Sequence, residues 1–182
     1  MNKTLLKYII TITLAAGILS GCVTSQNLER QGTKAYFEKD YETVQQKYTE
    51  ASAEGSAKAK YHLAVMYAEG KGVDQDYAKA AQLLDEASKK NHSDSQLMLG
   101  LFNVYGDGVP VNPEKGANLI TLAAKDGNDT AMYYLGNLYA VGLGVDKDIP
   151  TALKWMQKAK KNGFPVKEEL LTQEGLAALY KK

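Results

Sequence analysis

The sequence contains few of the residues on which metal sites and disulfides depend. Among its 182 residues it has one cysteine, Cys22, and two histidines, His62 and His92. A single cysteine cannot form a disulfide within the chain. Neither histidine has a cysteine or a second histidine at metal-ligand spacing, and no HExxH pattern occurs. The sequence therefore predicts no disulfide, no bound metal and no cofactor.

The chain also lacks an excess of positive charge. Its 22 lysine and arginine residues stand against 21 aspartate and glutamate residues, and two of the lysines lie in the first 21 residues, which hold no acid. Without that segment the count is 20 basic against 21 acidic residues (20 − 21), a net charge of about −1. This balance predicts no nucleic-acid partner and no binding of the protein itself to anionic membranes.

Catalytic motifs and phosphate-binding motifs are missing as well. No serine stands in a G-x-S-x-G context, no pair of carboxylates stands out as an acid–base couple, and the 12-residue EF-hand spacing is absent. The stretch "GKGV" at 70–73 lacks the third glycine of a dinucleotide-binding loop and the Gly-Lys-Ser/Thr end of a P-loop. We therefore expect a protein that is not an enzyme and has no small-molecule substrate.

The N-terminus has the organisation of an export signal. In "MNKTLLKYIITITLAAGILSGC", lysines precede an apolar stretch from about Tyr8 to Leu19, which is too short for a membrane-spanning helix. Its end, "LSGC", resembles the bacterial lipobox, which implies cleavage before Cys22 and acylation of that residue. Val23 follows the cysteine where aspartate would retain the protein, which by the family's sorting rules implies the outer membrane. An ordinary signal peptide with a chance cysteine, or an uncut signal anchor, is the alternative.

What the sequence has in abundance is self-similarity. Three columns of residues recur every 36 positions without insertion. They are Gly70, Gly106 and Gly142; Gly72, Gly108 and Gly144; and Val73, Val109 and Val145. A period of this length indicates a repeat architecture in which each copy is one small structural unit.

Each copy is predicted to form a pair of helices. In the first copy, Ala59, Leu63 and Met66 recur with the helical period. Gly70 stands where a helix C-cap needs positive φ, and Asp76 has the side chain of an N-cap for the second helix. Because a single pair cannot bury its apolar face, the copies must stack on one another.

The copies resemble Sel-1-like repeats, the 36-residue relatives of the tetratricopeptide repeat. The third copy matches the family pattern best, through Ala131, Leu135, Gly136, Tyr139, Gly142, Gly144, Val145, Asp148, Ala152, Trp155, Ala159 and Gly163. The second copy has Asn103 in place of the usual tyrosine, and the first has Ala64 and Asn91 in place of glycines. The resemblance implies an all-α fold, a right-handed α-solenoid of antiparallel helix pairs.

These patterns divide the chain into seven segments. They are a lipoprotein signal peptide (1–21), a lipidated N-terminus and tether (22–27), an N-terminal tetratricopeptide-like helix pair (28–56), three repeats (57–92, 93–128 and 129–164) and a C-terminal capping helix (165–182).

The resemblance also implies where a partner binds. In the tetratricopeptide superfamily the first helix of each pair lines a concave groove that holds segments of other proteins. Carried over by position, the groove residues are Tyr61, Val65, Leu97, Leu101, Tyr133 and Asn137. Tyrosines and aliphatic residues suit the capture of a peptide or helix. The alternative is that these side chains pack between neighbouring repeats or against the end helix.

The combined expectation is a lipid-anchored protein of the bacterial cell envelope that acts as a binding module or scaffold. Its partner would be another envelope protein, and the lipid on Cys22 would attach it to the membrane. One alternative is a surface-exposed factor that binds host or foreign-cell proteins. Another is an enzyme, because some cysteine-rich members of this repeat family are described as binding or hydrolysing β-lactams. The lack of paired cysteines and of an acyl-transfer triad disfavours that alternative.

Overall fold

The computed structural model describes residues 24–179, so Cys22 and the predicted signal peptide lie outside the described residues. Regular structure in the described part is helical throughout and contains no strand, which confirms the predicted all-α class. The chain divides into two compact units, Met1–Gln75 and Asp76–Lys182. None of the helices within residues 24–179 combines the length and the apolar character that crossing a membrane requires.

The first unit consists of helical residues 24–37, α2 (Tyr41–Ala53) and α3 (Ala57–Glu69), and α2 packs against α3. The buried side chains of α2 recur with the helical period and are Val44, Tyr48 and Ala51. Residues 24–27, which the sequence analysis assigned to the tether, are helical.

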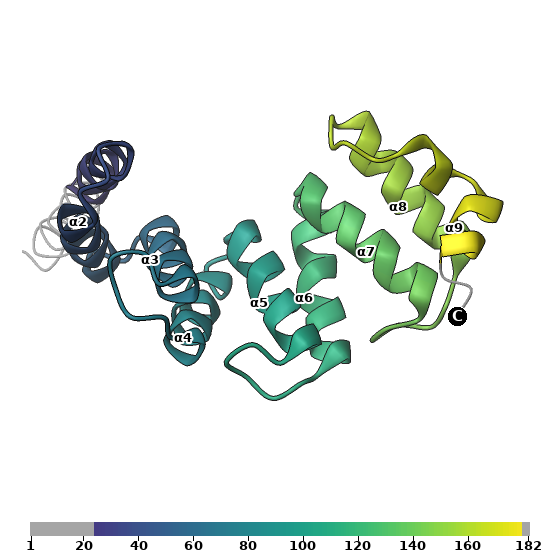
Figure 1. Ribbon diagram of the computed structural model, residues 1–182, viewed down its shortest axis with the longest axis horizontal. Helices are drawn as coiled ribbons and strands as arrows, with labels where there is room; N and C mark the ends of the chain where they lie inside the picture. Colours follow the sequence, from purple (N-terminus) through teal and green to yellow (C-terminus); the bar gives the residue numbers. More distant parts are fainter. Residues whose placement is uncertain (1–23, 180–182) are drawn as a thin grey trace, which may run out of the picture. The chain divides into compact units, whose positions relative to one another are not determined.

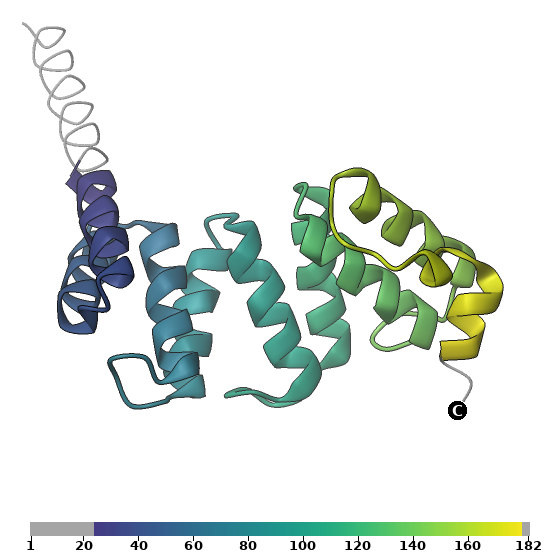
Figure 2. The ribbon, with the colours of Figure 1, turned by 45° about the horizontal axis from the view of Figure 1, so that its top comes forward.

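The second unit continues the succession of helices. It comprises α4 (Tyr77–Ser88), α5 (Ser93–Tyr105), α6 (Pro113–Lys125), α7 (Asp129–Val141), α8 (Ile149–Lys161), the 3₁₀ turn η1 (Glu168–Leu171) and α9 (Gln173–Leu179). Each helix from α4 to α8 packs against the next one in the chain. Figures 1 and 2 show α5, α6, α7 and α8 side by side in chain order from two angles. One apolar core runs through α5 to α9.

A side chain caps the N-terminus of every helix from α2 to α8. The caps are Asp40, Ser56, Asp76, His92, Asn112, Asn128 and Asp148, and each accepts a hydrogen bond from the backbone N–H three residues later. The predicted cap Asp76 accepts from the Lys79 N–H at 2.8 Å. Such a cap satisfies a donor that the helix itself leaves unpaired. His92, one of the two histidines of the chain, therefore has a structural role as the N-cap of α5.

A left-handed glycine ends the first helix of each repeat, as predicted for Gly70. Gly70 at the end of α3 has φ 66°, and Gly106 and Gly142 occupy the same position after α5 and α7. Asn91, in the turn that follows α4, has φ 59°, a conformation that asparagine tolerates better than most residues.

The second glycine of each loop has a separate role, which is close packing. A Cβ on Gly108 would overlap the carbonyl of Tyr77 at the start of α4, and one on Gly144 would overlap the carbonyl of Pro113 at the start of α6. Each loop thus lies against the first turn of the preceding second helix. The glycine pairs thus turn the chain between the two helices of a repeat, and the second glycine allows close packing on the preceding repeat.

The C-terminal segment differs from the single capping helix predicted for residues 165–182. Its helical structure is split into η1 and α9 by Thr172, which is extended at φ −120° and ψ 154°. Val166, Leu170 and Leu176 are all buried in the core of the second unit. Positions 170 and 176 fall on different sides of a 3.6-residue helix, so one continuous helix could not bury all three side chains.

Candidate functional site

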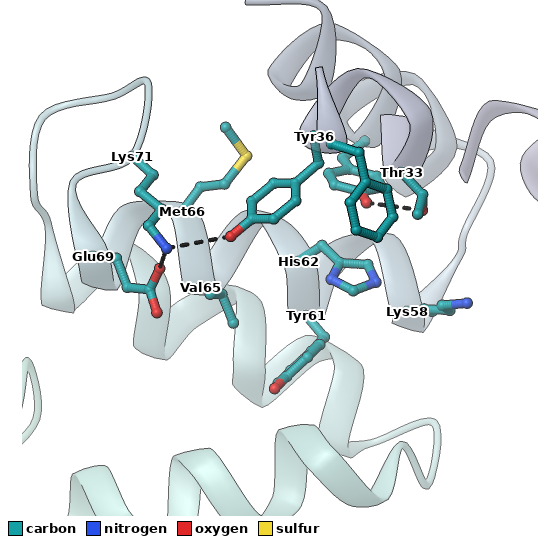
Figure 3. Close-up of a pocket in the computed structure, with 11 residues that line it drawn as sticks. Thr33, Tyr36, Lys58, Tyr61, His62, Val65, Met66, Glu69 and Lys71 are labelled. Atoms are coloured by element: carbon teal, nitrogen blue, oxygen red, sulfur yellow. Dashed lines mark hydrogen bonds and ion pairs between the residues drawn. The ribbon is translucent and has the colours of Figure 1, made fainter. Parts of the chain in front are cut away.

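The first unit contains a pocket of about 440 Å³ with aromatic walls, which we call the aromatic pocket (Figure 3). Its lining residues are Thr33, Tyr36, Phe37, Tyr48, Lys58, Tyr61, His62, Val65, Met66, Glu69 and Lys71. They come from helical residues 24–37, from α2 and from α3 with its following loop. A concave, mostly apolar site with a few polar groups is the usual form of a binding pocket.

One face of α3 supplies most of the pocket wall. Tyr61, Val65 and Glu69 follow one another at steps of four residues, and residues four apart lie above one another on a helix. The left-handed Gly70 then ends α3 and turns the chain, which places Lys71 at the same end of the pocket as Glu69 (Figure 3).

That end of the pocket carries a hydrogen-bonded lysine. The Lys71 ammonium lies 2.7 Å from a Glu69 carboxylate oxygen and donates to the Tyr36 hydroxyl at 3.2 Å. The carboxylate of Glu69 is the main reason that the pKa of Lys71 is raised, with the Tyr36 hydroxyl adding to it. Lys71 also lies 5.8 Å from the centre of the Tyr36 ring, within cation–π range. This end of the pocket is thus polar and charged.

The middle of the aromatic pocket is held by stacked rings. The Tyr48 and His62 rings lie 4.8 Å apart at an interplanar angle of 18°, and Tyr61 lies 5.5 Å from His62. The Tyr48 hydroxyl is 3.2 Å from the Thr33 hydroxyl. Only 3% of Tyr48 is exposed, and this burial raises the pKa of its phenol. These contacts pack the rings of Tyr48, His62 and Tyr61 against one another in the wall of the pocket.

Lys58 lies at the opposite end, beyond Tyr61 and His62 (Figure 3). Its ammonium is 4.0 Å from one oxygen of Glu29. The other oxygen of Glu29 accepts a hydrogen bond from the Ser56 hydroxyl at 2.5 Å. Glu29 is therefore shared between an N-cap residue and a lysine, and the side chain of Lys58 remains 58% exposed.

The second unit has a pocket of about 400 Å³ between α5 and α7, which we call the aliphatic pocket. Its lining residues are Leu101, Val104, Tyr105, Tyr133, Tyr134, Asn137, Leu138, Val141 and Leu143. No charged side chain lines it. Tyr133 also stacks on Phe164, with ring centres 5.0 Å apart, so part of this side chain packs against the C-terminal segment.

The two pockets use the same positions of the repeat. Six lining residues of the aromatic pocket correspond, two repeats later, to six lining residues of the aliphatic pocket. The corresponding pairs are Tyr61 and Tyr133, His62 and Tyr134, Val65 and Asn137, Met66 and Leu138, Glu69 and Val141, and Lys71 and Leu143. The first helix of a repeat thus forms a pocket with the same set of positions in both units.

The chemistry of these positions differs at the loop end. Glu69 and Lys71 flank the first loop glycine in the aromatic pocket, whereas Val141 and Leu143 flank it in the aliphatic pocket. The residues on either side of that glycine therefore decide whether the end of the pocket is charged or aliphatic.

Five of the six predicted groove residues line these pockets. Tyr61 and Val65 lie together in the first unit, and Leu101, Tyr133 and Asn137 lie together in the second. Leu97, the sixth, is only 8% exposed and belongs to the core of the second unit, so it lines neither pocket. Leu97 occupies the same repeat position as Tyr61 and Tyr133, but its side chain is covered by the core whereas the two tyrosines reach the pockets.

Sequence reasoning missed part of the aromatic pocket. Tyr36, Phe37 and Tyr48 lie before the first full repeat, so the 36-residue pattern assigns them no position. A signal was available in the adjacent pair Tyr36 and Phe37, because two large aromatic residues at the exposed end of a helix are uncommon.

The described residues provide no grouping typical of catalysis. Among residues 24–179, no cluster of three or more histidine, cysteine, aspartate or glutamate side chains is placed to hold a metal ion. His62 stacks on Tyr48, and the His92 ring accepts from the Ser95 N–H as a helix cap. Both pockets offer apolar surface, and the aromatic pocket also has charged ends, which suits binding.

The comparisons with known proteins agree with this architecture. A protective antigen with an SLR fold from uropathogenic Escherichia coli is 30% identical over 76% of this chain, with a TM-score of 0.73. A Sel1 repeat protein from Oxalobacter formigenes is 23% identical over 78% of this chain, with a TM-score of 0.69. This chain spans 31% of the length of the first protein and 60% of the second. Among curated proteins, no match was found.

The family itself is identified by sequence. The Sel1 repeat family model matches residues 57–92, 93–128 and 129–164, which together make up more than half of the chain. Sel1 repeats are generally protein–protein interaction modules, and proteins built from them are mostly non-catalytic. The predicted resemblance is confirmed, and this chain belongs to the Sel1 repeat family.

Proposed function

We propose that this protein is a lipid-anchored component of the bacterial cell envelope that binds a segment of another protein through pockets on the first helices of its repeats. The observation that carries the proposal is the use of the same six repeat positions in the aromatic pocket and the aliphatic pocket. Side chains that served only for packing would be expected to fill the space between helices, because protein interiors are close-packed, and here hollows of similar size occur at both places.

The contents of the pockets support a protein ligand. Volumes of about 440 and 400 Å³ suit one or two large side chains of a partner. Tyr61 and Tyr133 are half-buried, so each offers a large, stiff contact surface that loses little conformational entropy on binding. The formal net charge of the chain is only +1, so the chain as a whole exerts little long-range attraction on nucleic acid.

The anchor rests on the N-terminal sequence. Cys22 follows an apolar stretch of signal-peptide length and is the sole cysteine of the chain. Acylation of Cys22 would attach the protein to the membrane, and the following Val23 favours the outer membrane. The partner would then be another envelope protein.

Photocrosslinking in cells tests the binding proposal. A photoreactive amino acid at Tyr133 is expected to crosslink to one partner protein, and the same amino acid at the exposed Lys154 of α8 is expected not to. Mass spectrometry identifies the captured protein. Capture of a partner from Lys154 but not from Tyr133 would show that the pockets are not the binding surface.

The Escherichia coli relative favours a second candidate. It is described as a protective antigen, which is consistent with exposure on the cell surface. By this likeness the present protein would be a surface factor that meets host or foreign-cell proteins. Protease added to intact cells distinguishes the two candidates, because a surface factor is digested and a periplasmic protein is fully protected.

A further inference from the structure

A second hollow adjoins the aromatic pocket on the surface of the N-terminal helix. It has a volume of about 530 Å³ and shares Thr33, Phe37 and Lys58 with the aromatic pocket. Its remaining part is lined by Gln26, Glu29, Arg30 and Lys34, and we call it the basic hollow. Phe37 stands between the two spaces with 79% of its surface exposed, an unusual position for a phenylalanine unless something covers it.

The lining of the basic hollow is positively charged. Arg30, Lys34 and Lys58 stand against the single carboxylate of Glu29, a local net charge of +2 (3 − 1). Glu29 also accepts the hydrogen bond from Ser56, so its carboxylate interacts with both Ser56 and Lys58. This local surplus contrasts with the near-neutral charge of the whole chain.

The existing ion pairs of the basic hollow are weak, so they compete little with the carboxylate of a ligand for the same lysines. Lys58 and Glu29 are 4.0 Å apart, and Lys34 lies 3.7 Å from Glu38 with both side chains largely exposed. Pairs of this kind add little stability because water screens them. An incoming carboxylate can therefore replace or share these partners at small cost, whereas a basic ligand would meet repulsion.

We propose that the aromatic pocket and the basic hollow together bind an acidic protein segment. A large apolar or aromatic side chain enters the aromatic pocket, and neighbouring aspartate or glutamate residues lie over Arg30 and Lys58. This assignment rests on the proposed function and adds the chemistry of the bound segment. It is supported by the adjoining positions of the two spaces and by the positive charge of the basic hollow, which is complementary to acidic residues.

The second unit supplies a matched control. Tyr133 occupies the same repeat position as Tyr61, but the aliphatic pocket has no charged lining residue. Tyr133 also borders a hollow whose two charged lining residues, Lys167 and Glu169, are of opposite sign. If the acidic ligand binds at the first unit, Tyr61→Ala is expected to lower its affinity and Tyr133→Ala to leave its affinity unchanged.

The test uses a random heptapeptide library displayed on phage and the full-length protein purified in detergent. Enriched peptides are expected to combine an aromatic or large aliphatic residue with aspartate or glutamate. The most enriched peptide, labelled with fluorescein, is then titrated by fluorescence anisotropy. The double variant Arg30→Glu and Lys58→Glu reverses two charges and is expected to lower the affinity for this peptide by about tenfold. Both side chains are exposed, so the fold is retained, and circular dichroism checks this.

The possible outcomes separate this inference from the proposed function. Peptides that require Tyr61 but are neutral or basic, or that bind the charge-reversed protein equally well, overturn the acidic assignment and leave the binding function standing. If the library yields no peptide whose binding depends on Tyr61 or Tyr133, the result counts against both the acidic assignment and the proposed binding function. If the charge reversal instead weakens only the attachment to phosphatidylglycerol vesicles relative to phosphatidylcholine vesicles, the hollow holds lipid headgroups and the proposal is wrong.

Discussion

At the scale of single residues, the fold depends on small side chains where helices cross. A Cβ on Gly136 of α7 would lie 2.7 Å from Met156 Cγ and 3.0 Å from the Ala152 carbonyl oxygen of α8. Separations this short would force the two helices apart. The energetic cost of that movement is larger than the gain in helix propensity from replacing glycine with alanine.

We therefore predict that Gly136→Ala destabilises the protein by roughly 1–3 kcal/mol, the usual cost of overpacking a core. Urea unfolding followed by circular dichroism measures the change. Gln157→Ala, at an exposed position of α8, is the control and is expected to leave the unfolding midpoint unchanged. A Gly136→Ala variant as stable as the parent would show that α7 and α8 do not approach each other this closely.

The titration of Tyr48 makes a second residue-scale prediction. Burial raises the pKa of this phenol above that of an unfolded tyrosine, about 10. The folded state therefore favours the protonated form, and this contribution is fully present below the unfolded pKa and is lost as the pH rises through the folded pKa.

We expect the melting temperature to fall more between pH 8 and pH 11 in the parent than in Tyr48→Phe, which cannot ionise at this position. Lysines titrate in both proteins and cancel in the comparison. Equal falls in the two proteins would mean that Tyr48 is not buried in the folded state.

At the scale of elements, each glycine loop joins the two helices of one repeat, and the loops of the second and third repeats also pack against the preceding repeat. Gly108 has φ 67°, and a Cβ there would overlap the carbonyl of Tyr77 at the start of α4. The residue between the two glycines is Lys71, Asp107 or Leu143 in the three repeats, so that position is free to vary.

Gly108→Ala is accordingly predicted to cost about 1–3 kcal/mol, from the strained φ and the overlap with backbone. Asp107→Lys, which changes the charge of the same loop, is predicted to be neutral. Thermal melts of both variants provide the measurement. The opposite ranking would indicate that the loop is built around its charge and so serves a ligand.

The helix pairs were predictable because their signals are local. The 36-residue period, Gly70 as a C-cap and Asp76 as an N-cap each follow from residues close together in the sequence. The split of the C-terminal segment at Thr172 was not predictable in this way, because it depends on which side chains reach the core.

The pockets were predictable only in part. Tyr61 and Tyr133 follow from repeat position, whereas the burial of Leu97 depends on the length of its side chain and on its neighbours in the core. Tyr36 and Phe37 come from a segment outside the three matched repeats, and no periodic pattern places them beside α3.

At the scale of the whole molecule, the anchor and the pockets are separate parts of one proposed function. Cys22 lies outside the described residues, so its acylation stays a prediction from sequence. Cys22→Ser is expected to abolish incorporation of labelled palmitate and to move the protein from the membrane fraction to the soluble fraction. Labelling that persists in this variant would contradict the lipoprotein assignment.

The central claim is that the half-buried tyrosines of the first helices form the binding surface. Its most direct test is the affinity of the partner identified by crosslinking for three full-length variants, Tyr61→Ala, Tyr133→Ala and Lys154→Ala. Melting temperatures confirm that each variant is folded.

We predict that at least one tyrosine variant binds the partner about tenfold more weakly or worse, as is usual for a central aromatic contact, while Lys154→Ala binds as the parent does. Unchanged affinity in both tyrosine variants, together with a loss in Lys154→Ala, would contradict the claim.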